Sequence, residues 1–124
     1  MAKLQTLVVD SSPSALATVL TVLEFTVRCE VVGEASNGEE ALEMARSLSP
    51  ELVLMDWHLP AMNGLDTLRA LRSEMPETAV VLMSMSPEPG DRDEAISLGA
   101  HAFLDKGNRF HRELLRVVAG LSPI

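Results

Sequence analysis

The sequence predicts an α/β protein with a doubly wound parallel sheet, in which helices cover both faces. Five short apolar runs alternate with segments of helical period, and the connections are short enough for right-handed crossovers. The third run, Leu52–Met55, is apolar throughout, as expected of a strand buried on both faces. The 124 residues contain no internal repeat, low-complexity tract or linker, so we expect a single domain over residues 1–124.

The predicted strands are apolar runs bounded by turn or loop residues, which interrupt strand pairing. The loop Ser86–Gly90 is the richest in such residues, but it is too short to separate two domains. The five predicted strands are Leu4–Val9, Cys29–Ala35, Leu52–Met55, Ala79–Ser84 and Ala102–Leu104.

Capping signals predict the first two helices. Ser12 followed by Pro13 matches a helix cap and a first helical residue, and the period continues through Leu23. The segment Ser36–Glu39 has the pattern of a capping box, in which the serine caps the helix and the glutamate bonds back to it. The apolar residues after this box share one helix face: Ala41, Leu42, Ala45 and Leu48.

The remaining helices follow from a cap, a stop signal and helical period. Asn63 is expected to cap the third helix, which carries leucines at helical spacing. The fourth runs near Asp91 to Leu98, with Gly99 as its stop. The fifth starts at Arg109 and carries Leu114, Leu115, Val118 and Leu121.

Composition excludes several classes of protein. The net charge of −8 argues against binding of nucleic acid or anionic lipid by bulk electrostatics. Cys29 is the only cysteine, so an intrachain disulfide is impossible and a thiolate metal cluster is not expected. There is no signal-peptide core, and no apolar stretch approaches the roughly 20 residues needed to span a bilayer. We therefore expect a cytoplasmic protein without membrane contact.

Residues with reactive or charged groups stand at the carboxyl ends of four predicted strands. Asp10 follows the first, Asp56 the third and Lys106 the fifth, and Ser84 ends the fourth. These strand ends share one rim, where open α/β sheets bind ligands. Two acids with a carbonyl and water can hold Mg²⁺, and a cation with a hydroxyl can stabilise phosphoryl oxygens. One acid can be the nucleophile, giving an aspartyl phosphate.

Each of these residues also has a simpler interpretation. Asp10 and Asp56 could be helix-capping or loop acids, and a single Lys106 could be a solvated surface amine. We expect Trp57 to be a partly exposed loop aromatic. The histidines His58, His101 and His111 have no metal-site spacing, and we expect only the backbone of His58 to matter.

Over essentially all of its length the chain resembles the receiver domain of two-component response regulators. The resemblance implies a flavodoxin-like (βα)5 fold with strand order 2-1-3-4-5. Around Asn37–Leu42 it is closest to regulators that carry a C-terminal helix-turn-helix, which this chain lacks. The segments that carry the resemblance are Leu7–Pro13, Val32–Leu42, Leu52–Gly64 and Gly99–Lys106.

The resemblance implies a phosphoacceptor and a metal site. Asp56 would take a phosphoryl group from a phosphohistidine on a sensor histidine kinase or phosphotransfer protein. Asp10, Asp56 and the backbone carbonyl of His58 would bind Mg²⁺, with Ser11 as a further candidate ligand.

The resemblance also implies a switch and its partners. Lys106 would pair with the phosphoryl oxygens, the Ser84 hydroxyl would turn toward them, and Phe103 would move inward with it. The output surface would comprise the fourth and fifth helices and the fifth strand, which is compatible with a homodimer. Such a domain acts on a downstream output domain or protein. It is a signalling switch rather than an enzyme, although it promotes its own phosphorylation from small donors and its dephosphorylation.

Three departures from the family pattern weaken the expected metal and phosphoryl chemistry. Ser11 stands where a second acid is usual, so we expect weaker Mg²⁺ binding. Met85 follows Ser84 where a small residue is usual, and Gly107 replaces a proline that typically follows a cis bond. A non-proline cis bond costs about 2.5–4 kcal/mol, against about 0.5–1 kcal/mol before proline. The Lys106–Gly107 bond is therefore either trans with a rearranged loop, or strained.

These departures leave alternatives open. One is a phosphorylation-independent receiver that acts as a protein-interaction module. Another is the regulatory half of a DNA-binding transcription regulator, which the length of the open reading frame would reveal. An enzyme with an organic cofactor is not expected, because Asp10–Pro13 stands where a glycine-rich phosphate loop would follow the first strand.

Overall fold

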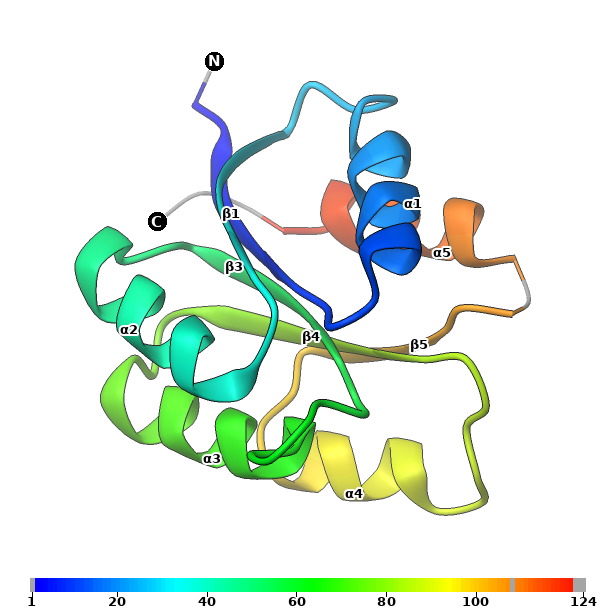
Figure 1. The fold of residues 1–124 in the computed structure, drawn as a ribbon. Helices are drawn as coiled ribbons and strands as arrows, with labels where there is room; N and C mark the ends of the chain where they lie inside the picture. Colours follow the sequence, from blue (N-terminus) through cyan, green and yellow to red (C-terminus); the bar gives the residue numbers. More distant parts are fainter. Residues whose placement is uncertain (1, 108, 122–124) are drawn as a thin grey trace.

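The computed structural model describes residues 2–107 and 109–121, which form a five-stranded parallel sheet with helices on both faces (Figure 1). The strand order β2-β1-β3-β4-β5 confirms the predicted topology. The prediction of one domain over residues 1–124 includes Met1, Asn108 and residues 122–124, which lie outside the described residues, and it stays a prediction. The strands are β1 (Leu4–Val9), β2 (Cys29–Ala35), β3 (Leu52–Asp56), β4 (Ala79–Ser84) and β5 (Ala102–Asp105).

The helices form two layers (Figure 1). On one face of the sheet lie α1 (Pro13–Leu23) and α5 (Phe110–Ala119). On the other lie α2 (Gly38–Leu48), α3 (Gly64–Glu74) and α4 (Asp91–Ser97). Within the described chain no helix has the length and apolar character that crossing a membrane requires.

Each strand contributes alternate side chains to two apolar cores, because successive strand residues point to opposite faces. Leu7 and Val9 of β1 pack in the core beneath α2, α3 and α4, whereas Val8 packs in the core beneath α1 and α5. All of β3 is buried, which confirms that this strand is covered on both faces.

Two predicted caps are confirmed and one is wrong by a residue. Ser12 caps α1 and Asn63 caps α3. For α2 the cap is Asn37 and not Ser36, because extended backbone at Asn37 places its carboxamide against the amide of Glu40, 2.9 Å away. The glutamate that bonds back is Glu40 rather than Glu39, and it accepts from the Ser36 amide at 3.0 Å.

Two strands extend one residue beyond the apolar run. Asp56 pairs with Met83 and Asp105 pairs with Ser84, so backbone pairing continues past the last apolar side chain. Between described residues no peptide bond is cis. The Lys106–Gly107 bond is therefore trans, the first of the two alternatives left open by the sequence.

Gly64 allows α3 to pack closely on the loop that follows β3. A Cβ at this position would lie 2.8 Å from the Trp57 carbonyl oxygen and 3.0 Å from that of Asp56. We expect Gly64→Ala to lower the free energy of unfolding by about 1–3 kcal/mol, because backbone must shift to relieve the clash. Urea denaturation measures this, with Gly120→Ala as the control, since its nearest atom is 3.5 Å away. Equal stability of the two variants would contradict the prediction.

Candidate functional site

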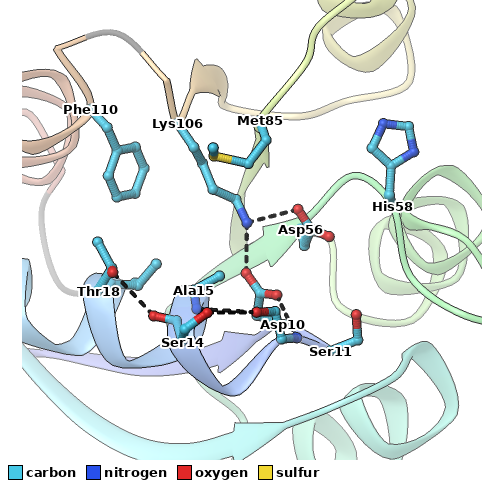
Figure 2. Close-up of a pocket in the computed structure, with 12 residues that line it drawn as sticks. Asp10, Ser11, Ser14, Ala15, Thr18, Asp56, His58, Met85, Lys106 and Phe110 are labelled. Atoms are coloured by element: carbon cyan, nitrogen blue, oxygen red, sulfur yellow. Dashed lines mark hydrogen bonds and ion pairs between the residues drawn. The ribbon is translucent and has the colours of Figure 1, made fainter.

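The carboxyl ends of three strands bring acidic and basic side chains together (Figure 2). Lys106, just after β5, places its Nζ 2.7 Å from Asp10 Oδ2 and 2.9 Å from Asp56 Oδ1. Asp10 follows β1 and Asp56 ends β3, so this cluster joins three strands. The structure thus assembles three of the four residues predicted to share the rim, and Ser84 lies at the adjacent end of β4.

Backbone hydrogen bonds hold each of these residues in place. The amide of Asp10 donates to the carbonyl of Ala35 at 3.0 Å, and that of Lys106 donates to Ser84 at 2.8 Å. After Asp56 the chain is anchored by the Trp57 amide, which donates to Met83 at 2.7 Å. The positions of the charged groups are therefore set by the sheet itself.

The cluster is buried, which shapes its electrostatics. Only 2% of Asp10 and 7% of the Lys106 side chain are exposed. Burial raises the pKa of Asp56, and the ion pair with Lys106 offsets only part of this rise. Burial alone would lower the pKa of Lys106, but the bonds to Asp10 and Asp56 outweigh it, so the pKa is raised and the amine stays charged. Two carboxylates thus share one ammonium group.

The raised pKa of Asp56 predicts how stability depends on pH. The folded chain keeps this proton to a higher pH than the unfolded chain, whose carboxyl titrates near 3.8. The protonated Asp56 carboxyl therefore stabilises the folded chain fully below pH 3.8. This contribution is lost as the pH rises through the pKa that Asp56 has in the folded chain. Because Asp56→Asn cannot ionise, we expect its stability relative to wild type to increase from about pH 4 to about pH 7.

Urea denaturation in the presence of a chelator, at a series of pH values, measures this difference. Glu77→Gln removes an exposed loop carboxylate and serves as the control. If the stability of Asp56→Asn relative to wild type fell with rising pH, the result would contradict a raised pKa for Asp56.

One oxygen of Asp56 is open. Its Oδ1 pairs with Lys106, whereas Oδ2 accepts no hydrogen bond from a described residue. Every buried side-chain nitrogen or oxygen in the described chain has a partner, so Oδ2 contacts solvent. It does so beside a pocket of about 500 Å³ that Asp56 itself lines, together with Ser11, His58, Met85 and Lys106 (Figure 2).

The donor groups at this pocket suit a hard cation such as Mg²⁺, which prefers oxygen ligands and retains several waters. The carboxylates of Asp10 and Asp56 line the pocket, as do Ser11 and His58. Among residues 2–107 and 109–121, no three or more His, Cys, Asp or Glu side chains gather into a metal site. A cation here would therefore depend on backbone carbonyl and water oxygens besides the two carboxylates.

The two residues predicted to switch, Ser84 and Phe103, are both buried. Ser84 is fully buried, and its hydroxyl accepts a hydrogen bond from the Ser86 amide at 3.3 Å. Phe103 is 2% exposed and contacts two side chains: the Trp57 ring meets it edge-on with the ring centroids 5.2 Å apart, and the guanidinium of Arg92 lies over its ring, 5.8 Å from the centroid. The expectation of a partly exposed Trp57 is wrong, because this ring packs into the core beneath α2, α3 and α4.

Sequence reasoning missed one wall of the pocket. Ala15 and Thr18 of α1 and Phe110 of α5 line the side opposite His58 (Figure 2), and Val19 of α1 also lines the pocket. Helical period places residues on a face but does not report which faces meet, so no signal in the sequence identifies this wall. Met85, expected to hinder access, lines the pocket with 62% of its surface exposed.

Comparison with known proteins finds a family match over most of the chain. The profile of the response regulator receiver domain matches residues 6–118. The nitrate/nitrite response regulator protein NarL of Escherichia coli K12 is 39% identical over 100 residues, which cover 81% of this chain and 46% of NarL. A protein-glutamate methylesterase/protein-glutamine glutaminase of Halalkalibacterium halodurans is 36% identical over 105 residues, covering 84% of this chain and 30% of that protein.

Solved structures agree with this match. The signal receiver domain of NarL from Mycobacterium tuberculosis superposes with a TM-score of 0.83 at 30% identity, covering 98% of this chain and 100% of that one. The response regulator domain of CheB from Thermotoga maritima superposes with a TM-score of 0.86 at 29% identity, covering 98% and 99% of the two chains. The chain spans less than half the length of the two full-length relatives above.

Proposed function

The chain belongs to the response regulator receiver family of two-component systems, and on that premise we propose that it accepts a phosphoryl group on Asp56. The donor is the phosphohistidine of a sensor histidine kinase or of a phosphotransfer protein. The observation that carries the proposal is the open Oδ2 of Asp56, which contacts solvent beside the pocket that Asp56 lines, while Lys106 holds the other oxygen. We also propose a cytoplasmic location, which is typical of the family.

In the proposed reaction Asp56 Oδ2 attacks the phosphorus atom of the donor. The new O–P bond forms as the P–N bond of the phosphohistidine breaks, and the imidazole leaves with the electron pair of that bond. Lys106 stays charged beside Asp56 and stabilises the negative charge on the phosphoryl oxygens.

The donor set supports a role for Mg²⁺. Asp10, Asp56 and the His58 carbonyl would hold the ion, with the Ser11 hydroxyl as a further ligand. When bound, the ion would neutralise charge on the transferring phosphoryl group. Because a neutral serine is a poorer ligand than a carboxylate, we propose that binding is weak.

The proposed response runs through Ser84 and Phe103. A phosphoryl group on Asp56 gives the Ser84 hydroxyl a new acceptor and so draws the loop after β4 toward the site. Phe103, which contacts Trp57, then changes its packing on α4. The affected face, made by α4, β5 and α5, would act on an output domain or protein, or on a second copy of the chain.

Beryllofluoride with Mg²⁺ tests the proposal, because it mimics an aspartyl phosphate. We expect the fluorescence of Trp57 to change, since Trp57 is the residue after Asp56 and its ring contacts Phe103. Asp56→Asn is the control and should show no change. If neither the fluorescence nor the NMR shifts of the wild type respond at high Mg²⁺, the proposal fails.

A second candidate is a phosphorylation-independent interaction module. It is favoured by Ser11, which leaves Asp10 and Asp56 as the two acids that line the pocket. This candidate predicts that Asp56→Asn keeps full binding to the partner. In either case the chain could be the receiver of a longer DNA-binding regulator, and the length of the open reading frame decides that.

A further inference from the structure

The pocket beside Asp56 is larger than a phosphoryl group needs. Its volume of about 500 Å³ lies within the range of about 300–1,000 Å³ that small-molecule sites typically have. A phosphoryl group adds one phosphorus and three oxygen atoms to the Asp56 carboxylate, so it occupies only the part of the pocket next to Asp56 and Lys106. The rest of the pocket is available to the part of a donor that leaves.

One side of this pocket is largely apolar. We call this side the helix wall and define it as four lining residues of α1 and α5, namely Ala15, Thr18, Val19 and Phe110. Val19 and Phe110 belong to the core beneath α1 and α5, so packing fixes their positions before any ligand arrives. A preformed surface of this kind binds apolar groups without the cost of ordering loose side chains.

The hydroxyl groups of α1 at this wall already have partners in the chain. Thr18 Oγ1 donates to the Ser14 carbonyl at 3.1 Å. The Ser12 hydroxyl accepts from the Ala15 amide at 3.3 Å and pairs with the Ser14 hydroxyl at 3.1 Å. A polar ligand that replaced these bonds would gain few hydrogen bonds in net terms. The wall therefore favours an apolar group over a polar one of the same size.

Charge limits what else can enter the pocket. Among the described residues that line it, Lys106 is the one lysine or arginine, and its amine lies between Asp10 and Asp56. A phosphoryl group on a ligand can use this ammonium group. A second anionic group would find no further lysine or arginine there, and it would meet a chain of net charge −8. The ligand that fits carries one phosphoryl group and an uncharged, apolar remainder.

We propose that the pocket takes acyl phosphates with an apolar acyl group, such as benzoyl phosphate, as direct phosphoryl donors to Asp56. The inference rests on the proposed function, because Asp56 is the acceptor. Asp56 Oδ2 attacks the phosphorus atom, and the new O–P bond forms as the bond from phosphorus to the bridging acyl oxygen breaks. The acyl carboxylate leaves with that electron pair, so the step moves no proton. The helix wall holds the acyl group.

Rates of Asp56 phosphorylation by benzoyl phosphate and by acetyl phosphate test the proposal on the whole chain. Intact-protein mass spectrometry measures them and distinguishes a phosphoryl from an acyl group on the protein. We expect the KM for benzoyl phosphate to be about tenfold below that for acetyl phosphate, because the phenyl ring adds apolar contact with the helix wall. Asp56→Asn should take a phosphoryl group from neither donor.

Thr18→Asp places a carboxylate on the helix wall. We expect it to lower kcat/KM for benzoyl phosphate about fivefold more than kcat/KM for acetyl phosphate, because the acyl group loses apolar contact. Both donors carry the same phosphoryl group, so any effect of the new charge on that group cancels in the ratio. Thr21→Asp is the matched control, since Thr21 is also exposed, also donates to the carbonyl four residues before it and does not line the pocket. It should keep the wild-type ratio.

The two donors separate failure of this inference from failure of the proposed function. The inference alone fails if acetyl phosphate phosphorylates Asp56 but benzoyl phosphate shows no lower KM, or if Thr18→Asp and Thr21→Asp give the same ratio. It also fails alone if neither donor phosphorylates a chain that responds to beryllofluoride. No phosphorylation by either donor and no response to beryllofluoride would overturn both. Phosphorylation of Asp56→Asn by benzoyl phosphate would show a different acceptor and overturn the inference.

Discussion

Replacing Asp56 by asparagine is expected to abolish covalent phosphorylation. The carboxamide keeps the size of the side chain but is not a nucleophile, so labelling should fall by more than about 100-fold. Intact-protein mass spectrometry or phosphate-affinity electrophoresis, after incubation with a phosphorylated kinase or phosphotransfer protein, measures the loss.

Controls separate loss of the nucleophile from loss of the fold. Lys106 still pairs with Asp10 in the Asp56→Asn variant, so the chain should remain folded. Asp93→Asn removes an exposed carboxylate on α4 and should be phosphorylated like the wild type. Phosphorylation of Asp56→Asn at the wild-type rate would show that another residue is the acceptor. A wild-type chain that takes no phosphoryl group from any donor in a panel would favour the interaction module.

Replacing Lys106 by methionine is expected to destabilise the fold as well as the site. Methionine preserves much of the side-chain volume, but it leaves Asp10 and Asp56 buried without their shared cation. Removing one partner of a buried ion pair typically costs about 3–5 kcal/mol, because the remaining charge stays desolvated. Urea denaturation near neutral pH measures the loss.

The same variant carries a pH signature. Without the ammonium group the two carboxylates bind protons more readily, so the loss of stability should shrink as the solution is acidified. Arg69→Met removes an exposed cation on α3 and should cost less than about 1 kcal/mol. Restoring stability to Lys106→Met by adding Asp10→Asn would confirm that unpaired charge, rather than lost packing, is the cause. A loss below about 1 kcal/mol for Lys106→Met would mean that water screens the cluster.

Much of the fold follows from local patterns. The limits of β1, β2 and β4 were predicted to the residue, because each run is bounded by turn or loop residues, which interrupt strand pairing. Ser12 and Asn63 were predicted as caps, because a short polar side chain before a helical run can bond a free amide. The cap of α2 was misplaced, since Ser36 and Asn37 are both good caps and only backbone conformation chooses between them.

The site was predictable in its members but not in its contacts. Parallel strands bring their carboxyl ends to one rim, so Asp10, Asp56 and Lys106 could be grouped from the sequence alone. Burial of the cluster and the open Oδ2 of Asp56 could not. They depend on the two ion pairs of Lys106, one with Asp56 and one with Asp10, which is 96 residues away in the chain.

The sequence by itself determined the class of fold, the order of the elements and the residues at the rim of the sheet, because these depend on periodicity and local capping. Tertiary structure alone decided which helix faces meet and which groups lose contact with water. It buried Trp57 against Phe103 and closed the pocket with α1. Such contacts join distant parts of the chain, and side-chain packing and desolvation determine them.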